Sequence, residues 1–466
     1  MTTSHLYKAL LVLALTMGLP GNTLAQGKAI NGGPQDQNQI SSLGGSLRSA
    51  ERHPLHILYV HGIGAEGAGD SWIFQKHLCA LLKGCKLPKK LVSVGRDYAD
   101  SGVFAHDAPP PASKYMRKEV WASQEEWRAS APFVDHYLLR RSDGDPVVVD
   151  EINWYPLVLS LKCRQMMAGE SWLAGPNKHF LDLCSKTEED PSHNGRYISY
   201  DWIKSPDARM LESIRPRGAL VNRGLKTSLL DWGFADALMA VGNMHDLFRE
   251  GMRQLLVNSA RFRSDEPETD AWEQPGVGPH RIETEFVVVS HSLGSYLVFS
   301  TLNINQQDSV PEAPSARPMS DETTAREDAA AEFILQRTSL VYFFANQIPL
   351  LELANLEGPK AADELGTRMQ RWRELRQNFG KGAVGPRDLS VKEPQVVAWS
   401  DPSDLLTWCL PDMKPLTVVN LYVRNTWWHW LIARPAAAHN NYASNKQVLR
   451  MMMSAEPSSA KGEVCR

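Results

Sequence analysis

Short apolar runs recur along the chain, and two of them lead directly into helical patterns. Residues 55–60 (LHILYV) predict a buried strand, since the run is short and rich in bulky apolar side chains. Residues 286–289 (FVVV) form a second apolar run, followed by a helix-like stretch. Strands are also predicted at 394–399 and 416–423, and the segment that starts at Ala345 ends another. At least two strands thus pass directly into helices.

Helical periodicity follows the first strand. Asp70 is the expected N-cap of this helix, and Gly84 stands where a C-terminal residue with positive φ would be. A long helix is predicted from 228 to 260, and the triplet 451–453 is interpreted as the buried side of a terminal helix. The expected apolar stripes of the first two helices are Ile73/Phe74, His77/Leu78 and Leu81/Leu82, and Phe234, Leu238, Val241, Phe248, Met252 and Leu255.

Other segments are irregular or polar. Residues 135–141 and 147–154 flank a turn and predict a hairpin or two adjacent strands. Residues 263–281 and 305–332 contain proline and acidic residues and predict loops or disorder. The second of these includes a short predicted helix at 325–332.

The first residues have the pattern of a targeting signal. Lys8 precedes an apolar run at 9–17, and small residues at 23–25 suit a cleavage site. The apolar run is too short to span a bilayer, so export is favoured over retention as an uncleaved anchor. We expect residues 1–25 to be a signal peptide that directs the chain to the periplasm or outside the cell. Residues 26–50, rich in Gly, Gln, Asn and Ser, are expected to form a flexible leader.

The segment 290–295 (SHSLGS) joins the second apolar run to its helix. This context is typical of a nucleophile elbow, a strained turn that holds a serine with its hydroxyl exposed. The usual pattern is G-x-S-x-G; here Ser290 replaces the first glycine and Gly294 supplies the second. An ordinary turn between strand and helix is the alternative. Ser292 is the candidate nucleophile.

The glycine-rich segment 61–64 (HGIG) follows the first strand and opens its helix. An acyl-transfer enzyme must supply N–H donors to the oxygen that becomes negative in the tetrahedral intermediate. We expect the backbone N–H groups of Ile63 and Leu293 to form this oxyanion hole. A tight turn without such a role is the alternative.

An acid and a base are available downstream. The turn-rich segment 400–406 (SDPSDLL) carries two carboxylates. We favour Asp404 as the acid because apolar residues that follow it can anchor its loop, whereas Asp401 is expected to start the turn. His439, the last histidine of the chain, lies in the small-residue loop 435–442 (PAAAHNNY), which can bring an imidazole to the sheet edge.

Together these segments resemble the α/β-hydrolase superfamily, in particular its bacterial lipase-like and esterase-like members, in which the serine, the acid and the histidine follow in that chain order. The resemblance rests on residues 61–64, 290–294, the Asp404 turn and 439–442, with 345–351 ending a further strand. It implies an α/β-hydrolase fold, with a mostly parallel twisted sheet, helices on both faces and polar loop insertions. The site would lie at the carboxyl ends of the strands.

The implied activity is the hydrolysis of carboxylic esters through an acyl-enzyme on Ser292, with His439 as the base and Asp404 orienting it. The substrate would be a small-molecule or lipid ester, and no cofactor or metal is implied. An amidase, thioesterase or acyltransferase would use the same triad. A catalytically silent scaffold that binds a partner or lipid is an alternative of another class. The resemblance places one domain over residues 51–466, with insertions near 100–215, 263–281 and 305–332.

Composition agrees with a large globular protein. The chain has 466 residues, of which 43% are hydrophobic and 22% charged, so there is ample material for a core. The net charge of −3 argues against a dedicated nucleic-acid surface. The sequence has no phosphate-binding loop ending in Lys-Ser/Thr, no His-Glu-x-x-His and no paired Cys-x-x-Cys, so nucleotide and structural-metal functions have little support.

Two features bear on packing. The tryptophan-rich segment 425–431 (NTWWHWL) is interpreted as a loop packed on the sheet; alternatively it lines an acyl pocket or rests on lipid headgroups, so peripheral membrane contact stays open. Six cysteines in an exported chain predict disulfides, and we favour pairing of nearest neighbours. The expected bridges are Cys79–Cys85, Cys163–Cys184 and Cys409–Cys465.

Overall fold

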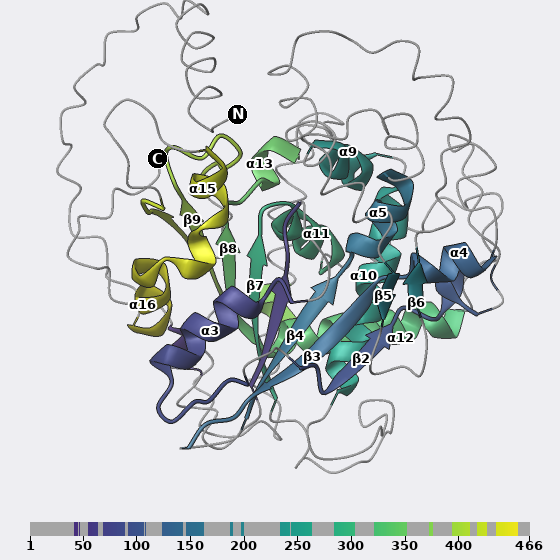
Figure 1. Cartoon of the computed structure of the whole chain (residues 1–466), viewed down its shortest axis with the longest axis horizontal. Coiled ribbons are helices and arrows are strands. Elements are labelled where there is room, and N and C mark those ends of the chain that lie inside the picture. Colours follow the sequence, from purple (N-terminus) through teal and green to yellow (C-terminus); the bar gives the residue numbers. More distant parts are fainter. Residues whose placement is uncertain are drawn as a thin grey trace, which may run out of the picture.

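An eight-stranded mixed sheet, in the order β10-β9-β8-β7-β1-β4-β3-β2, forms the centre of the fold (Figure 1). The computed structural model describes residues 42–44, 46, 55–63, 69–88, 92–106, 108, 124–142, 146–162, 187–189, 197–199, 234–242, 244–262, 284–302, 321–351, 372–375, 394–410, 417–425 and 435–454. The strands of this sheet are β1 (Leu55–Val60), β2 (Gly95–Tyr98), β3 (Phe133–Leu139), β4 (Val147–Asn153), β7 (Glu285–His291), β8 (Thr338–Phe344), β9 (Gln395–Ser400) and β10 (Thr417–Tyr422). A separate two-stranded sheet pairs β5 (Thr187–Glu189) with β6 (Tyr197–Ser199).

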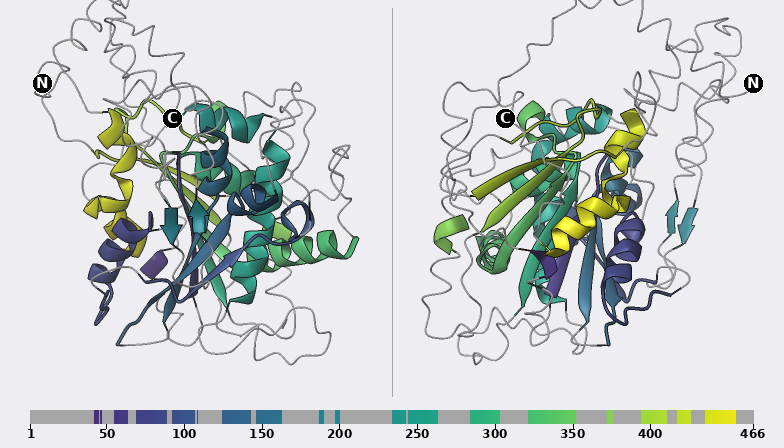
Figure 2. Two further views of the ribbon diagram at one scale, coloured as in Figure 1. Left: turned by 45° about the vertical axis from the view of Figure 1, so that its right-hand side comes forward. Right: turned by 90° about the vertical axis from the view of Figure 1, so that its left-hand side faces the viewer.

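Helices cover the large sheet on both faces (Figure 2). On one face the core contains side chains of α3 and α16, and on the other it contains side chains of α10 and α11. The helices are α3 (Trp72–Leu81), α4 (Gln124–Ala129), α5 (Tyr155–Lys162), α9 (Ala235–Val241), α10 (His245–Arg261), α11 (Leu293–Thr301), α12 (Asp321–Arg337), α13 (Ile348–Leu351), α15 (Pro435–Asn440) and α16 (Lys446–Ser454), with 3₁₀ turns η1 (Gly102–Phe104) and η7 (Tyr442–Ser444). Among the described helices, none combines the length and apolar character needed to cross a membrane.

Most neighbouring strands are parallel. β1 pairs in parallel with β4 and β7, and the parallel series continues through β8, β9 and β10, whereas β3 is antiparallel to both β4 and β2. β1, β4, β8 and β9 are buried along their whole length, as expected of strands covered on both faces. The carboxyl ends of β1, β7, β8 and β9 therefore lie at one edge of the sheet, which is where candidate site residues follow the strands. The α/β class expected from the resemblance is thus observed.

The predicted strands are confirmed, but several helices differ from their predictions. The long helix expected at 228–260 is broken at Gly242, a poor helix former, into α9 and α10, and Phe234 and Leu238 are exposed rather than part of a buried stripe. α12 is longer than the short helix expected at 325–332, because its buried Ala330, Ala331 and Ile334 anchor it to the core. The MMM triplet does lie in a terminal helix, with Met451 and Met452 buried.

The loop expected at 435–442 begins instead as the helix α15. This segment contains a run of alanines, and alanine has the highest helix propensity of all residue types. Proline is well tolerated at the first helical position. α3 also begins later than expected. Ser71, not Asp70, is its N-cap residue, and the stripe buried from this helix is Phe74 and Leu78, while Ile73 is exposed.

Two features of the structure bear on the expected domain organisation. The insertion expected near 100–215 contains β3 and β4, which are integral strands of the sheet because their apolar residues pack on both faces. The leader expected to be flexible includes Leu43, which is fully buried and donates its N–H to the hydroxyl of Tyr342 over 3.1 Å. The segments 263–281 and 305–320 lie outside the described residues.

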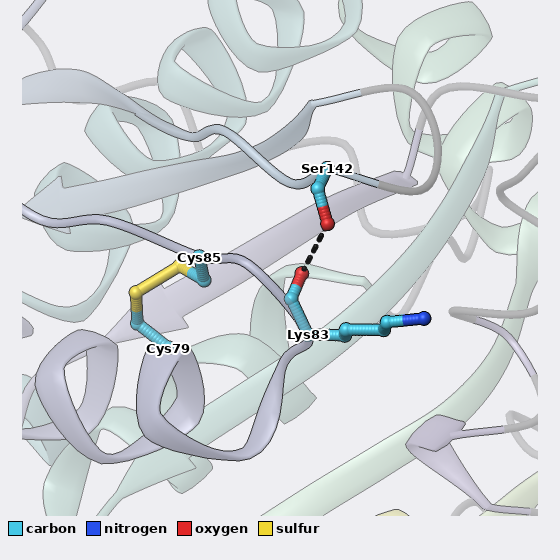
Figure 3. Close-up of a disulfide and its surroundings, with 4 residues drawn as sticks. All are labelled: Cys79, Lys83, Cys85 and Ser142. Atoms are coloured by element: carbon cyan, nitrogen blue, oxygen red, sulfur yellow. Dashed lines mark hydrogen bonds between the residues drawn. A yellow bond between two sulfur atoms is a disulfide. The ribbon is translucent and has the colours of Figure 1, made fainter.

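A disulfide joins Cys79 to Cys85, as predicted from their spacing (Figure 3). Between them Gly84 has φ 67°, which lets the chain turn back after α3, and the hydroxyl of Ser142 donates to the carbonyl of Lys83 over 3.3 Å. Cys409 is also disulfide-bonded, with a partner outside the described residues, so its pairing with Cys465 stays a prediction. Cys163 and Cys184 lie outside the described residues.

Candidate active site

Ser292 occupies a strained turn between β7 and α11. Its φ of 54° and ψ of −124° lie in a region that a residue with a side chain rarely adopts. The Ser292 N–H donates to the carbonyl of Phe344 over 2.8 Å, and the Ser292 carbonyl accepts the N–H of Ser295 over 3.0 Å. These two bonds hold the turn, and backbone strain persists only where surrounding contacts fix it in this way.

The loop after β1 lies directly against this turn. A Cβ added to Gly62 would lie 2.8 Å from Cβ of Ser292, closer than real atoms approach. A Cβ added to Gly294 would lie 2.7 Å from the carbonyl oxygen of Val60. Both positions therefore require glycine, and Gly62, the residue before Ile63, lies against Ser292. Leu293 is the first residue of α11, where backbone N–H groups lack partners within the helix.

Ser290 takes the place of the usual first glycine of the elbow. It is fully buried, and its hydroxyl donates to Oγ of Ser295 over 3.1 Å. The extra polar atom is thus satisfied within the turn, so the substitution leaves no buried hydroxyl without a partner.

The structure brings Ser292, His439 and Asp404 into contact. Nε2 of His439 lies 2.8 Å from Oγ of Ser292, and Nδ1 of His439 lies 2.9 and 3.0 Å from the two carboxyl oxygens of Asp404. The three residues come from the end of β7, from α15 and from the turn after β9. The elbow was expected to expose the serine hydroxyl, and this expectation is wrong: Ser292 is 0% exposed, because the side chains of His439 and Gln347 both contact its oxygen.

Asp404 accepts hydrogen bonds from several donors. Besides His439, it accepts the N–H of Leu406 over 2.9 Å and the hydroxyl of Tyr442 over 3.4 Å. A carboxylate that faces Nδ1 of His439 fixes the ring proton on that nitrogen. Nε2 of His439 is then free to accept the proton of Ser292.

Asp401 has a different set of contacts and does start the turn. Its carboxylate accepts the N–H of Ser403 over 2.8 Å and the N–H of Asn425 over 2.6 Å. Its own N–H donates to the hydroxyl of Tyr442 over 2.6 Å. Asp401 therefore joins the acid turn to the segment after β10 and does not contact His439.

Two further histidines border the elbow and are held neutral. His61 is buried and stacks on Trp154, with ring centroids 4.7 Å apart, and burial lowers its pKa to about 4. His291 places Nε2 2.7 Å from the carbonyl of His439. Burial, and then the neighbouring His439, lower the pKa of His291 to about 3. Both rings are therefore uncharged near neutral pH.

Sequence reasoning missed three polar residues of this site. Gln347 donates from Nε2 to Oγ of Ser292 over 2.8 Å. Asn346 donates from Nδ2 to the carbonyl of Trp408 over 3.0 Å and so ties the end of β8 to the acid turn. Tyr442 bridges Asp401 and Asp404. A signal was present for the first two, since both are polar and directly follow a buried strand.

No metal centre accompanies this arrangement within the described part of the chain, where no cluster of three or more His, Cys, Asp or Glu residues is placed to hold an ion. The tryptophan pocket considered at 425–431 lies outside the described residues, apart from Asn425. Comparison of the chain with models of known protein families, with curated proteins and with solved structures found no match.

Proposed function

We propose that the protein is an exported serine hydrolase of the α/β-hydrolase superfamily, and that it cleaves carboxylic esters through an acyl-enzyme on Ser292. The observation that carries this proposal is the hydrogen-bonded series Ser292, His439, Asp404, which starts at a strained turn between a central strand and a helix. The chain order of the three residues also agrees with this superfamily.

In the proposed reaction, Oγ of Ser292 attacks the ester carbonyl carbon while its proton passes to Nε2 of His439. The carbonyl oxygen becomes negative and accepts N–H bonds from Ile63 and Leu293. When the intermediate collapses, the leaving alcohol takes the proton from His439 and the acyl group stays on Ser292. Water then attacks the acyl-enzyme with His439 as its base, which releases the carboxylic acid and restores the serine.

The same geometry would serve an amidase, a thioesterase or an acyltransferase, since these differ in leaving group or acceptor. A silent scaffold that binds a partner or lipid is favoured by one observation, the complete burial of Ser292. The Cys79–Cys85 bridge supports export, because disulfides persist in oxidising compartments.

A serine-directed phosphonate tests the proposal. We expect the purified protein to be labelled on the peptide that contains Ser292 and to hydrolyse short activated esters. Ser292→Ala and His439→Ala should each lower the hydrolysis rate by about 10³-fold or more. Ser300→Ala is a matched control, because this serine lies on the same helix and its hydroxyl donates only to the carbonyl of Leu297. Full activity in folded Ser292→Ala would refute the proposal, and absence of labelling would favour the scaffold.

A further inference from the structure

The side chain of Gln347 contacts the atom that would react. Nε2 of Gln347 lies 2.8 Å from Oγ of Ser292, and the residue is 3% exposed. We propose that Gln347 is a catalytic residue whose amide donates a hydrogen bond to Oγ and stabilises the negative charge that develops there as the proton passes to His439. This inference rests on the proposed function and adds a donor beyond the triad and the oxyanion hole.

The direction of the hydrogen bonds requires the amide NH₂ group to face the serine. Nδ1 of His439 faces a carboxylate and so carries the ring proton, which leaves Nε2 as an acceptor. The single hydroxyl proton of Ser292 must therefore point to His439. Oγ can then only accept from Gln347, and a glutamine has only its NH₂ group to donate. All donors in the series thus point the same way, from Gln347 to Asp404.

The backbone two residues before Gln347 is strained. Ala345, at the end of β8, has φ 50° and is the second non-glycine residue with positive φ in the described chain, after Ser292. Its N–H donates to the carbonyl of Trp399 over 3.2 Å. On the next residue, Oδ1 of Asn346 accepts the N–H of Ile348 over 2.9 Å. Strain held by neighbouring contacts is a property of functional sites, and here it fixes the start of α13 beside the elbow.

A neutral donor at this position would assist both halves of the reaction. During acylation, Oγ loses its proton to His439 while it bonds to the carbonyl carbon, so negative charge passes through Oγ. During deacylation the bond between Oγ and the acyl carbon breaks, and Oγ again carries charge until it recovers the proton from His439. A donor that is already in place and buried stabilises such charge more than water does.

Gln347→Met tests the donor, because methionine has a similar length and no N–H. We expect the rate constant of phosphonate labelling and kcat for a short ester each to fall by about 10–100-fold, with KM nearly unchanged. Gln347→Glu should lower the labelling rate constant and kcat further, because its carboxylate accepts the serine proton in competition with His439 and places a negative charge beside Oγ.

Gln254→Met is the matched control. Gln254 is as buried as Gln347, and its amide bonds the backbone N–H and carbonyl of Ser101 over 3.0 and 2.8 Å, away from the elbow. We expect this variant to lower the melting temperature but to label at the wild-type rate. Labelling of Gln347→Met at the wild-type rate, or equal slowing in both methionine variants, would overturn the proposed role of Gln347. Neither result would contradict the proposed function of Ser292. A wild-type protein that does not label at Ser292 would overturn the proposed function, and this role with it.

Discussion

Among single residues, Asp401 and Asp404 lie three positions apart but have different contacts. Asp404 accepts hydrogen bonds from His439, Leu406 and Tyr442, so its carboxylate orients the imidazole ring. Asp401 accepts two backbone N–H groups and holds the turn together. Substitution of these residues should therefore separate catalysis from stability.

We predict that Asp404→Asn lowers ester hydrolysis by about 10⁴-fold, because an amide at this position no longer fixes the tautomer of His439. Asp401→Asn should lower activity by at most about 10-fold but reduce the free energy of unfolding by about 1–3 kcal/mol, since a charged acceptor of two N–H groups is lost. Steady-state kinetics and urea unfolding measure the two effects. If Asp401→Asn, and not Asp404→Asn, gave the large loss of activity, Asp401 would be the acid.

At the scale of elements, the elbow depends on close contact between β1 and α11. Gly294, on the first turn of α11, lies against the backbone carbonyls of Val60 and His61. Because backbone atoms cannot move aside as a flexible side chain can, any Cβ at this position must displace the helix from the strand.

We therefore predict that Gly294→Ala destabilises the protein by about 1–3 kcal/mol, although alanine is the better helix former. It should also slow phosphonate labelling, since the displacement of α11 moves Leu293 and Ser292. Ser300→Ala, on the same helix, should leave both quantities near the wild-type value. Thermal unfolding and labelling rates provide the comparison, and an alanine variant more stable than wild type would show that the contact is not tight.

Elements differ in how far the sequence could predict them. Buried parallel strands such as β1 and β7 are continuous apolar runs, so their positions were clear from the sequence. The ends of the helices were harder to predict. α3 begins at Trp72 because the N–H groups of Gly69 and Ser71 bond the buried carboxylate of Glu151, 80 residues away in sequence from Ser71. A contact of that separation leaves no local pattern near the helix.

At the scale of the whole molecule, a largely buried ionic network crosses four neighbouring strands, β1, β4, β3 and β2. His136 on β3 places Nδ1 2.6 Å from Asp150 on β4 and Nε2 3.0 Å from Asp97 on β2. His56 on β1 also bonds Asp150 over 2.8 Å, and Phe262 stacks on the ring of His136. Burial alone would lower the pKa of His136, but the two aspartates outweigh it and raise the pKa to about 9.

This network predicts a loss of stability in mildly alkaline solution. Because the pKa of His136 is higher in the folded state than the ordinary value of 6.5, its contribution is full below pH 6.5 and disappears as the pH rises through about 9. The contribution is on the order of 3 kcal/mol. We expect the difference in unfolding free energy between wild type and His136→Gln to shrink from pH 6 to pH 9.5 in chemical denaturation. A constant difference would show that His136 is not charged in the folded protein.

Much of the candidate site was visible in the sequence because its residues follow predicted strands. Ser292 and Asp404 lie in turns after β7 and β9, and His439 follows β10 along the chain. Gln347 follows a strand too, but the role proposed for it depends on the approach of β8 to β7 and on the φ of Ala345, neither of which a linear pattern encodes. The burial of the site is likewise a property of the assembled chain.

The strand order also sets the order in which the protein can be completed during synthesis. β1 is made early, and its neighbour β4 ends at Asn153, but its other neighbour β7 emerges only by His291. Until then one edge of β1 is open to pairing with other chains. If the protein is exported as proposed, the unpaired edge of β1 favours a chain that crosses the membrane unfolded and completes its sheet afterwards. Since His439 follows every strand of the sheet, hydrolytic activity would be the last property that the growing chain acquires.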